Sequence, residues 1–403
     1  MKVLYIASIF PKENEEDNIY TDLAEALKEK GHDVVVVVSE ERKNASETRM
    51  CRERNIEVIR VKTGNLYNVG LFEKATSFIT MQNKLKDAIN KYLSDKKFDL
   101  VLLMAPPITM YSVAKFAMKK FNCISYLMQK DIFPQNALDL GILNKPNPAY
   151  LYFRNIEKKL YKTVTVIGCM SNGNKQYLLE NNSFIDEKKI ELFPNTIKIN
   201  KELYWSKTSI KQKYNIPEDN VIAIYGGNFG RAQGIDFLIK VLDEYKNNNK
   251  VYFILIGKGT EKDRLFKHIQ INKIKNVLYL DYVPKKEYCE ILSQSDIGLV
   301  FLDHRFTIPN IPSRTLTYFE YSLPIMAATD KSTDYKELIE NESLSGLWCE
   351  SNNLKEFINK FNFLLDNPKI RKEMGERGRK YLENNLGVDK SVELLEQAFN
   401  KFK

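Results

Sequence analysis

The sequence has few cysteines and few histidines. Its five cysteines are scattered, odd in number and form no C-x-x-C pair, and there are only three histidines. We therefore expect neither a disulfide framework nor a zinc site, and a histidine-rich metal centre is disfavoured. Scattered thiols fit a reducing compartment, so we expect a cytoplasmic protein.

Long apolar runs are also missing. None approaches the roughly 18 residues needed to cross a bilayer, and we expect neither a signal peptide nor a spanning helix. The net charge is +9, and six of these charges lie within residues 1–200. This mild excess fits an anionic membrane surface or a phosphorylated substrate, and it argues against a nucleic-acid-binding arm.

The turn after the first strand lacks the G-x-G-x-x-G fingerprint, which disfavours a nicotinamide dinucleotide fold. Buried strands and amphipathic helices alternate instead. Residues 2–9 (KVLYIASI) and 33–39 (DVVVVVS) are apolar runs around an expected helix at 19–30, which predicts a parallel strand–helix–strand unit. Because 403 residues exceed a typical single core, we expect two α/β domains.

The same alternation continues along the chain. Further strands are expected at 57–61, 100–104, 124–128, 164–169, 191–193, 221–225, 251–256, 277–280, 297–301 and 325–328. A long helix over 68–97 ends in a basic stretch and could lie on anionic lipid, although packing of its apolar stripe on the sheet is favoured. A final amphipathic helix is expected over 388–402.

The segment 308–330, read as IPNIPSRTLTYFEYSLPIMAATD, organises the second half. Ser313 can cap a helix over 314–321, whose first N–H groups and Arg314 suit an anion such as a diphosphate. Glu320 in the same helix could accept two hydrogen bonds from the vicinal hydroxyls of a sugar. The segment predicts a nucleotide site, and an ordinary capped helix is equally compatible with it.

Glycines follow two further strands of the second half. Strand 221–225 runs into GGNFGR at 226–231, and strand 251–256 runs into GKGT at 257–260. Glycine lets the backbone approach a ligand closely, and Arg231 could meet phosphate. A glycine pair is a weak signal alone, but a phosphate-bearing ligand accounts for several such strand ends at once.

Asp131 comes shortly after the expected strand 124–128. Ligands of open α/β sheets bind at the carboxyl ends of the strands, so this carboxylate could act as a base or orient an acceptor. A turn aspartate that hydrogen-bonds its own loop is the alternative.

In this order and spacing, the motifs resemble the retaining glycosyltransferases of the GT-B type, family 4, over almost the full length. They are LAEALKEKGHDVVVV after the opening strand, PN at 194–195, YGGNFGRAQGIDFL, IGKGTEKDRL, NVLYLDYVPKKEY, SDIGLVFL, PSRTLTYFEYSLPIMA and KEMGERGRKYL. The resemblance implies an α/β fold of two facing Rossmann-like domains with parallel sheets and a central cleft. Residues 1–200 would bind the acceptor, 201–385 would bind the nucleotide sugar, and helix 386–403 would return toward the N-terminal domain.

Within this group the chain looks most like the N-acetyl-fucosamine-type transferases of capsule and O-antigen synthesis, because of DIFP at 131–134 and GNFGRAQG at 227–234. The resemblance implies that Asp131 is catalytic and that no metal or other cofactor is needed. The implied donor-binding residues are Gly227, Asn228, Arg231 and Gln233 along the diphosphate, Gly257, Lys258 and Gly259 in the pocket, Tyr282 at the base, Ser313, Arg314, Thr315 and Leu316 as diphosphate donors, and Glu320 at the ribose.

The chain departs from the family pattern in three places. Pro312 stands where many members have a second glutamate, eight residues before the ribose-binding one. Asn228 and Gln233 stand where many have arginine and lysine, a change that the fucosamine-type subgroup tolerates. Residues 15–18 replace the usual glycines after the first strand, so contact of this loop with donor phosphate is not expected.

These observations predict a membrane-associated enzyme at the inner face of the cell membrane. It would move a sugar from a nucleoside diphosphate, with uridine as the expected base, to a lipid-linked (polyprenyl diphosphate) glycan and retain the anomeric configuration. Two alternatives stay open: a non-catalytic transferase-like partner subunit, motivated by Pro312, and a sugar-nucleotide epimerase of the same double fold.

Overall fold

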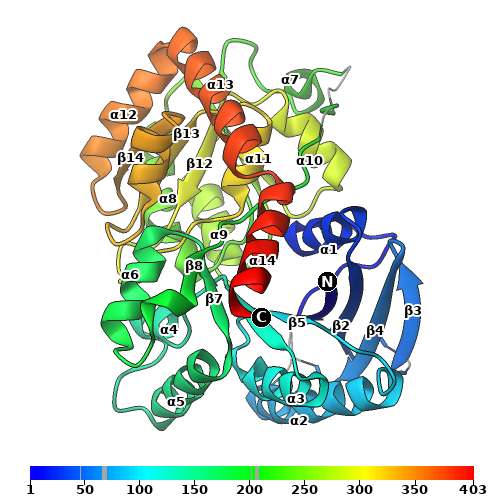
Figure 1. The fold of residues 1–403 in the computed structure, drawn as a ribbon. Coiled ribbons are helices and arrows are strands. Elements are labelled where there is room, and N and C mark those ends of the chain that lie inside the picture. The colour runs from blue at the N-terminus through cyan, green and yellow to red at the C-terminus, as the bar shows by residue number, and fades with distance from the viewer. Residues whose placement is uncertain (46, 66–69, 201, 205–207) are drawn as a thin grey trace. The chain divides into compact units, whose positions relative to one another are not determined.

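The chain folds into two units (Figure 1). Unit 1 comprises Met1–Lys198 and Gly387–Lys403, and unit 2 comprises Ile199–Leu386. The computed structural model describes all residues except 46, 66–69, 201 and 205–207, and it leaves out the side chains at positions 71, 72, 74, 75 and 79. The acceptor-binding and donor-binding roles expected for the two halves remain predictions.

Unit 1 is built on a sheet in the order β3-β4-β2-β1-β5-β6-β7-β8. Its strands are β1 (Lys2–Ala7), β2 (Asp33–Glu41), β3 (Arg49–Glu53), β4 (Ile56–Thr63), β5 (Leu100–Ala105), β6 (Ile124–Gln129), β7 (Val166–Cys169) and β8 (Ile190–Leu192). Every pairing is parallel except that of β3 with β4. The crossovers between parallel strands require intervening helices, which cover both faces of the sheet.

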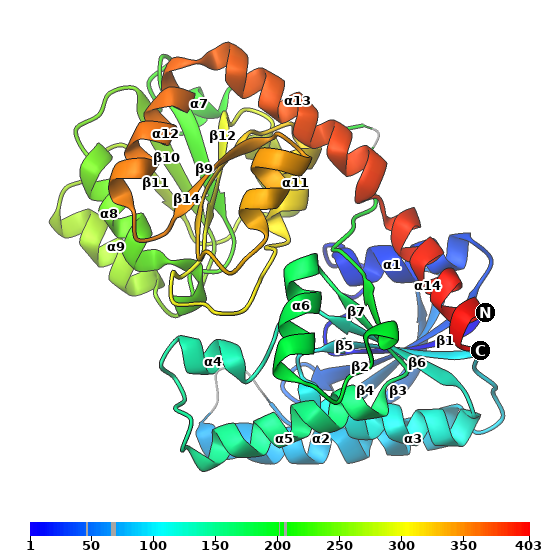
Figure 2. The same ribbon diagram turned by 60° about the vertical axis from the view of Figure 1, so that its left-hand side comes forward.

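Helices α1 (Ile19–Glu29) and α14 (Val388–Phe402) cover one face of this sheet, and α2 (Leu71–Tyr92), α3 (Tyr111–Phe121) and α5 (Pro148–Thr163) cover the other (Figure 2). Val3 and Tyr5 point to the first face, and the alternate residues Leu4 and Ile6 point to the second; all four are buried. Two covered faces explain why β1 reads as one apolar run. The shorter helices of unit 1 are η1 (Ile108–Met110), α4 (Gln135–Asp139), α6 (Asn172–Asn181) and η2 (Glu187–Lys189).

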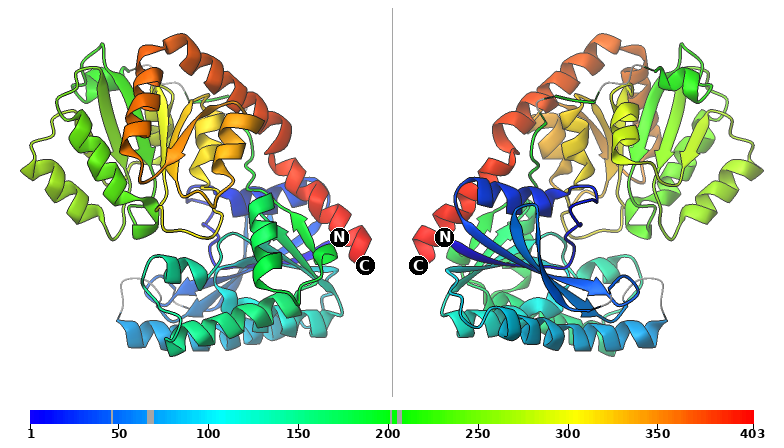
Figure 3. Two further views of the ribbon diagram at one scale, coloured as in Figure 1. Left: turned by 90° about the vertical axis from the view of Figure 1, so that its left-hand side faces the viewer. Right: turned by 90° about the vertical axis from the view of Figure 1, so that its right-hand side faces the viewer.

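Helix α14 completes unit 1 from the far end of the chain. Its residues Val388, Val392, Leu395 and Ala398 belong to the same buried cluster as the inner face of α1. Figure 3 shows the red C-terminal helix beside the blue α1 in both views.

Unit 2 contains a parallel sheet in the order β11-β10-β9-β12-β13-β14. Its strands are β9 (Val221–Gly226), β10 (Val251–Ile256), β11 (Val277–Leu280), β12 (Ile297–Phe301), β13 (Ile325–Thr329) and β14 (Gly346–Glu350). The prediction of two parallel α/β sheets is therefore confirmed. The strand order reverses between β9 and β12, because β10 and β11 are added on one side of β9 and β12 to β14 on the other. Ligands of open α/β sheets bind at such a switch point.

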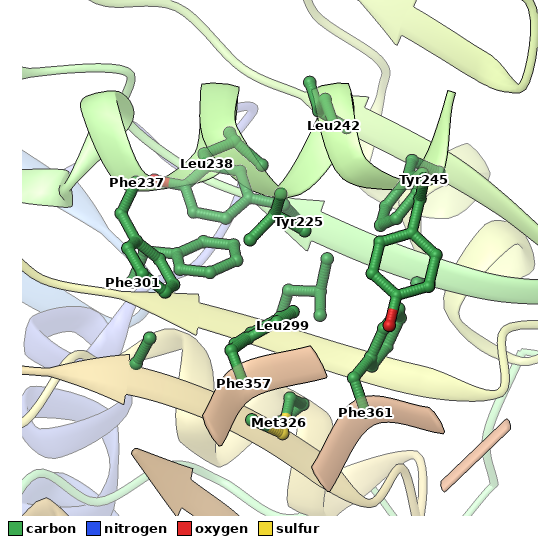
Figure 4. Packing of buried hydrophobic residues seen from close by; sticks show 14 of the residues in the cluster. Tyr225, Phe237, Leu238, Leu242, Tyr245, Leu299, Phe301, Met326, Phe357 and Phe361 are labelled. Atoms are coloured by element: carbon green, nitrogen blue, oxygen red, sulfur yellow. The ribbon is translucent and has the colours of Figure 1, made fainter. Parts of the chain in front are cut away.

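An aromatic-rich core lies between one face of the unit 2 sheet and the helices that cover it (Figure 4). Phe237 of α8 (Ile235–Tyr245) meets Phe357 of α12 (Leu354–Asp366) edge to face, with ring centroids 5.6 Å apart. The other helices of unit 2 are α7 (Ile210–Lys213), η3 (Arg231–Gln233), α9 (Lys262–Ile271), α10 (Lys285–Leu292), α11 (Arg314–Glu320), η4 (Glu337–Glu342) and α13 (Pro368–Asn385).

The structure differs from the expected elements in several places. Strands β3 and β14 were not predicted, because β3 (RMCRE) is polar and β14 (GLWCE) is short and contains few β-branched residues. The helix expected over 68–97 is α2 (Leu71–Tyr92), and residues 68 and 69 lie outside the described residues. Residues 201, 205 and 206 of the polar connection that follows Pro194 lie outside them as well.

Candidate active site

The loops after β9 and β10 pack closely against each other. Gly227, Gly257 and Gly259 have φ angles of 141°, 147° and 157°, which favour glycine. A Cβ atom on Gly257 would lie 1.8 Å from the carbonyl oxygen of Gly227. The Phe229 N–H also donates to the Lys258 carbonyl at 2.7 Å. Loop packing therefore requires these glycines, and it leaves Gly227 exposed at the carboxyl end of the sheet.

Polar side chains on the same loops reach the surface. Asn228 and Lys258 are exposed, and Tyr282, after β11, is 62% exposed. The Lys258 Nζ lies 5.4 Å from the ring centroid of Tyr282. The structure thus brings together two of the predicted donor-site residues on neighbouring strand ends.

Arg314 connects the start of α11 to the loop after β9. Its Cζ lies 4.3 Å from the ring centroid of Tyr225, a cation–π arrangement, and its Nη2 donates to Oε1 of Gln233. A Cβ atom on Gly227 would lie 3.0 Å from the same Nη2. Gly227, Gln233 and Arg314, distant in sequence, therefore form one cluster, as expected for a donor site.

The other terminal nitrogen of Arg314, Nη1, is buried and lacks an acceptor at hydrogen-bonding geometry among the described residues. Leaving a buried donor unsatisfied costs about 1–3 kcal/mol, and more for a charged group. A phosphate oxygen is an acceptor that a guanidinium binds well, and one that bound this nitrogen would displace the atoms that now cover it.

Arg231 lies apart from this cluster. Its side chain is largely exposed, and its Nε is 3.5 Å from Oε1 of Glu261, just before α9. Arg264 of α9 contacts the same carboxylate at 2.9 Å. The predicted phosphate contact of Arg231 would require its side chain to leave Glu261.

The start of α11 differs from the expected capped helix. Ser313 occupies the cap position, but it is exposed and its side chain makes no capping bond, because its backbone is already helical. The Thr315 N–H donates to the Pro312 carbonyl at 3.2 Å and the Leu316 N–H to the Ser313 carbonyl at 3.1 Å. These two amides are therefore engaged within the turn, and the prediction that all four residues offer N–H groups to a diphosphate would require both amides to leave these bonds.

Glu320 is at the far end of α11. Its side chain is 6% exposed, and its Oε1 accepts hydrogen bonds from the Asn200 N–H at 2.9 Å and from the Asn200 side-chain amide at 3.1 Å. Burial raises the pKa of this carboxyl. Six residues of helix place Glu320 about 9 Å beyond Arg314 along the axis and on a different side. The ribose contact of Glu320 remains a prediction, and within unit 2 its carboxylate holds Asn200.

Sequence reasoning missed the aromatic residues around Arg314. The ring of Tyr225 packs against the guanidinium. The Tyr318 hydroxyl accepts a hydrogen bond from the Gly226 N–H at 3.2 Å and donates one to the Ile224 carbonyl at 3.2 Å. The i, i+4 spacing of Arg314 and Tyr318 on a helix could have indicated that they share a face.

Unit 1 has a cavity of about 1020 Å³ at the carboxyl ends of its central strands. Its wall includes the ends of β1, β2, β5 and β6, among them Ser8, Phe10, Ser39, Glu40, Met104, Pro106, Lys130 and Asp131. Apolar groups such as Phe78 and Met81 of α2 line it as well. The cavity can therefore hold a ligand with both polar and apolar parts.

Asp131 lines this cavity and also fixes its own loop. Its Oδ1 accepts the Ile132 N–H at 2.8 Å, and its Oδ2 accepts the Asn136 side-chain amide at 2.6 Å. Burial raises the pKa of Asp131 to about 6, although both hydrogen bonds act to lower it. The residue thus shows the contacts of a turn aspartate together with the position expected of a site carboxylate.

Lys130, its neighbour, was not among the predicted site residues. Its Nζ lies 5.2 Å from the ring centroid of Phe193, and no carboxylate pairs with it in the described part of the chain. Burial lowers the pKa of Lys130 to about 7. An anionic ligand in the cavity would favour its charged form.

Two further observations concern metal ligands and membrane spans. Among the residues that the structure describes, no group of three or more His, Cys, Asp or Glu side chains is arranged to hold a metal ion. No helix in the described ranges is both long enough and apolar enough to traverse a bilayer.

Comparison with known proteins identifies two family matches. The family described as "Glycosyltransferase Family 4" matches residues 18–201, and that described as "Glycosyl transferases group 1" matches residues 206–381. Together they cover most of the chain.

Individual relatives are distant. The chain is 24% identical over 254 residues to the probable glycosyltransferase WbjE of Pseudomonas aeruginosa, a match that covers 62% of this chain and 60% of that protein. It is 29% identical over 118 residues to the O-antigen biosynthesis glycosyltransferase WclY of Escherichia coli, covering 29% and 32%. The matches thus span less than two thirds of these relatives' length.

Solved structures share the whole architecture. Sucrose-phosphate synthase from Thermosynechococcus elongatus superposes with a TM-score of 0.78 at 15% identity, covering 100% of this chain and 99% of that one. The HepE protein of Anabaena, solved in complex with UDP, superposes with a TM-score of 0.69 at 13% identity, covering all of both chains. The predicted GT-B fold is therefore confirmed.

Proposed function

Because the chain belongs to the group 1, family 4 glycosyltransferases, we propose that it transfers a sugar from a nucleoside diphosphate, with retention of configuration, to a lipid-linked glycan. Uridine is the proposed base, since HepE was solved with UDP. The proposed pathway is assembly of a surface polysaccharide such as capsule or O-antigen, since the relative WclY is named for O-antigen biosynthesis. An N-acetyl-fucosamine-type donor fits the motifs DIFP and GNFGRAQG.

The buried guanidinium of Arg314 beside the glycine loop is the observation that carries this proposal. The guanidinium lies beside Gly227 through Nη2, and the exposed backbone of Gly227 leaves room for a diphosphate. A guanidinium held there would stabilise the negative charge that develops on the departing diphosphate. Tyr225 and Gln233 hold the guanidinium in place, which makes the site preorganised.

The remaining predicted donor contacts are proposed around this cluster. Asn228, Gly257, Lys258 and Gly259 would line the pocket, and Tyr282 would meet the base. Ser313 and Arg314 retain backbone N–H groups that are not used within the described turn, so they are the proposed diphosphate amides. Glu320 is the proposed ribose ligand only if Asn200 gives up its bonds to the carboxylate.

The acceptor is proposed to occupy the cavity of unit 1. Phe78, Met81 and Met104 offer apolar walls, and Lys130 offers a cation that has no carboxylate partner among the described residues. A polyprenyl diphosphate-linked sugar combines these two properties. Asp131 would accept the proton of the attacking hydroxyl, or hold that hydroxyl in place while the leaving phosphate oxygen takes the proton.

A donor screen tests the proposal. The protein is incubated with radiolabelled UDP- and GDP-sugars and a membrane extract that supplies lipid-linked acceptors, and the products are separated into lipid, free sugar nucleotide and free sugar. Label in the lipid fraction is the expected result. Donor binding without turnover would favour a non-catalytic subunit, and an isomerised free nucleotide sugar would favour an epimerase.

The proposed place of work is the cytoplasmic face of the cell membrane. No helix of the described chain crosses a bilayer, while a polyprenyl-linked acceptor is confined to one, so the protein would bind the surface peripherally.

A further inference from the structure

Helix α5 exposes large apolar side chains at its first turn. Leu151 is 58% exposed and Tyr152 is 54% exposed, and Ile142 in the preceding connection is 56% exposed. Single exposed apolar residues are common on protein surfaces, but two adjacent ones on a helix that otherwise buries its apolar stripe are informative. This end of α5 therefore exposes apolar side chains that a lipid bilayer or another molecule could cover.

The same layer of unit 1 is basic. The exposed lysines are Lys115, Lys119 and Lys120 on α3 and Lys158, Lys159 and Lys162 on α5. The two helices lie side by side beneath the sheet (Figure 2). None of the six pairs with a carboxylate within the described ranges of the chain.

Acidic side chains do not offset this charge. The sequences of α3 and α5 contain a single carboxyl residue, Glu157. It is 2% exposed, and it is bound by Arg154 at 2.6 Å and by the Tyr161 hydroxyl at 2.9 Å. The exposed side chains of the two helices therefore include six positive charges and no negative charge.

We propose that the outer face of α3 and α5 lies on an anionic lipid bilayer, with Leu151 and Tyr152 inserted among the headgroups and the lysines over them. This inference extends the membrane contact of the proposed function by assigning it to one surface. Apolar side chains beside a cationic face are the combination by which helices bind in the interface of anionic membranes. A protein partner would have to be both acidic and apolar at one site, whereas an anionic bilayer offers both properties everywhere.

The arrangement also connects the surface to the acceptor cavity. Phe153, next to Tyr152, packs edge to face on Phe133 with ring centroids 5.0 Å apart. Phe133 belongs to the loop that starts at Asp131. Binding of α5 to lipid would thus hold this loop close to the bilayer, where a lipid-linked acceptor resides.

The test measures co-sedimentation of the full chain with vesicles and uses neither donor nor acceptor, so its outcome is independent of the transferase activity. Vesicles of phosphatidylcholine with phosphatidylglycerol are compared with vesicles of phosphatidylcholine alone. We expect binding to the mixed vesicles only, and its loss at high salt because the Debye length falls to about 3 Å at 1 M. Equal binding to both vesicle types, or binding to neither, would overturn the proposal.

Two variants locate the surface. Lys158→Gln/Lys159→Gln/Lys162→Gln should weaken partition to the mixed vesicles by about 100-fold, since each lysine near such a surface contributes about fivefold. Leu151→Gln/Tyr152→Gln should weaken it by about tenfold. Melting temperatures within the error of the parent would show that both variants are folded.

Matched controls change unit 2 by the same amount. The triple variant Lys246→Gln/Lys355→Gln/Lys369→Gln removes three exposed lysines, and Ile271→Gln/Phe363→Gln removes two exposed apolar side chains. Both controls should bind like the parent. If the α5 variants and these controls weaken binding equally, or if Leu151→Gln/Tyr152→Gln instead splits a dimer of the parent on size exclusion, the face is not the lipid-binding surface.

Discussion

The guanidinium of Arg314 lies over the ring of Tyr225 with its Cζ 4.3 Å from the ring centroid, and one of its nitrogens is left without an acceptor in the described chain. Arg314→Lys keeps the charge but loses the planar contact with the ring and the fork of donors. We expect the Kd for UDP to rise by about 10- to 100-fold, the cost of one or two charged hydrogen bonds. Isothermal titration calorimetry measures it.

Arg231→Lys is the matched control for that substitution, because Arg231 faces Glu261 and lies outside the cluster. Its Kd should stay within about threefold of the parent, less than the effect of a single charged hydrogen bond. If the Kd of Arg314→Lys also stays within about threefold of the parent, Arg314 does not contact the diphosphate.

Asp131→Asn separates catalysis from loop structure. If Asp131 takes a proton from the acceptor, turnover should fall by about 10²- to 10⁴-fold while UDP affinity is unchanged. If Asp131 only stabilises its own loop, the melting temperature should fall, because the NH₂ group of the new asparagine cannot accept the hydrogen bond that the Asn136 amide donates to Asp131. Turnover and melting are measured on one preparation; turnover within about threefold of the parent would remove Asp131 from the chemistry.

The pH dependence follows from Lys130 and Asp131. Turnover should rise as pH passes upward through about 6, where Asp131 ionises, and acceptor affinity should fall as pH passes upward through about 7, where Lys130 loses its proton. A lipid-linked acceptor series between pH 5 and 9 checks both limbs, with kcat reporting the first and KM the second. In Lys130→Arg the KM limb should disappear.

The same pKa shifts affect stability in opposite directions. Because the pKa of Asp131 is raised from 3.8 to about 6 on folding, its contribution to stability is present below pH 3.8 and is lost as pH rises through 6. Because the pKa of Lys130 is lowered from 10.5 to about 7, its contribution is present above pH 10.5 and is lost as pH falls through 7. Denaturant unfolding of Asp131→Asn against the parent across pH 4–7 isolates the first effect.

Glu320 and Asn200 form a pair whose two partners can be removed separately. Glu320→Ala should lower the free energy of unfolding by about 1–3 kcal/mol, because it leaves the Asn200 groups unsatisfied. If Glu320 also holds the ribose, the Glu320→Ala substitution should weaken UDP binding by a similar free energy. Asn200→Ala leaves the carboxylate free and should not weaken UDP binding. Unchanged UDP affinity in Glu320→Ala would leave Glu320 with its structural contact alone.

A chelator test addresses the charge on the leaving group. In the proposed site, Arg314 supplies the positive charge that a divalent cation supplies elsewhere. Turnover in excess EDTA should equal turnover without it. Loss of turnover that Mn²⁺ or Mg²⁺ restores would contradict this role of Arg314.

The sequence alone predicted the elements whose residue pattern is local. Strand β11 has the expected bounds, 277–280, because a short apolar run between turn residues is a local signal. Strand β3 was not predicted, since an edge strand that pairs only with β4 can be polar. The expected helix at Arg314 was found, but its cap depends on a backbone angle at Ser313 that residue preference does not determine.

Contacts between distant residues could not be predicted in the same way. The bond of Asn200 to Glu320 joins residues 120 positions apart, and nothing in either local pattern indicates it. The environment of Lys130 was missed because it depends on Phe193, which follows another strand. Motif resemblance located the glycine loops and Arg314, but it did not show that one guanidinium nitrogen is buried without an acceptor.

The place of α14 in unit 1 has a consequence for synthesis on the ribosome. Domains usually fold as they are made, N-terminal first. Here, however, the inner face of α1 is covered by Val388, Val392 and Leu395, which are translated only after all of unit 2. The first unit to be made is therefore the last to bury its core, and its nascent form presents an uncovered apolar face for as long as unit 2 is being translated.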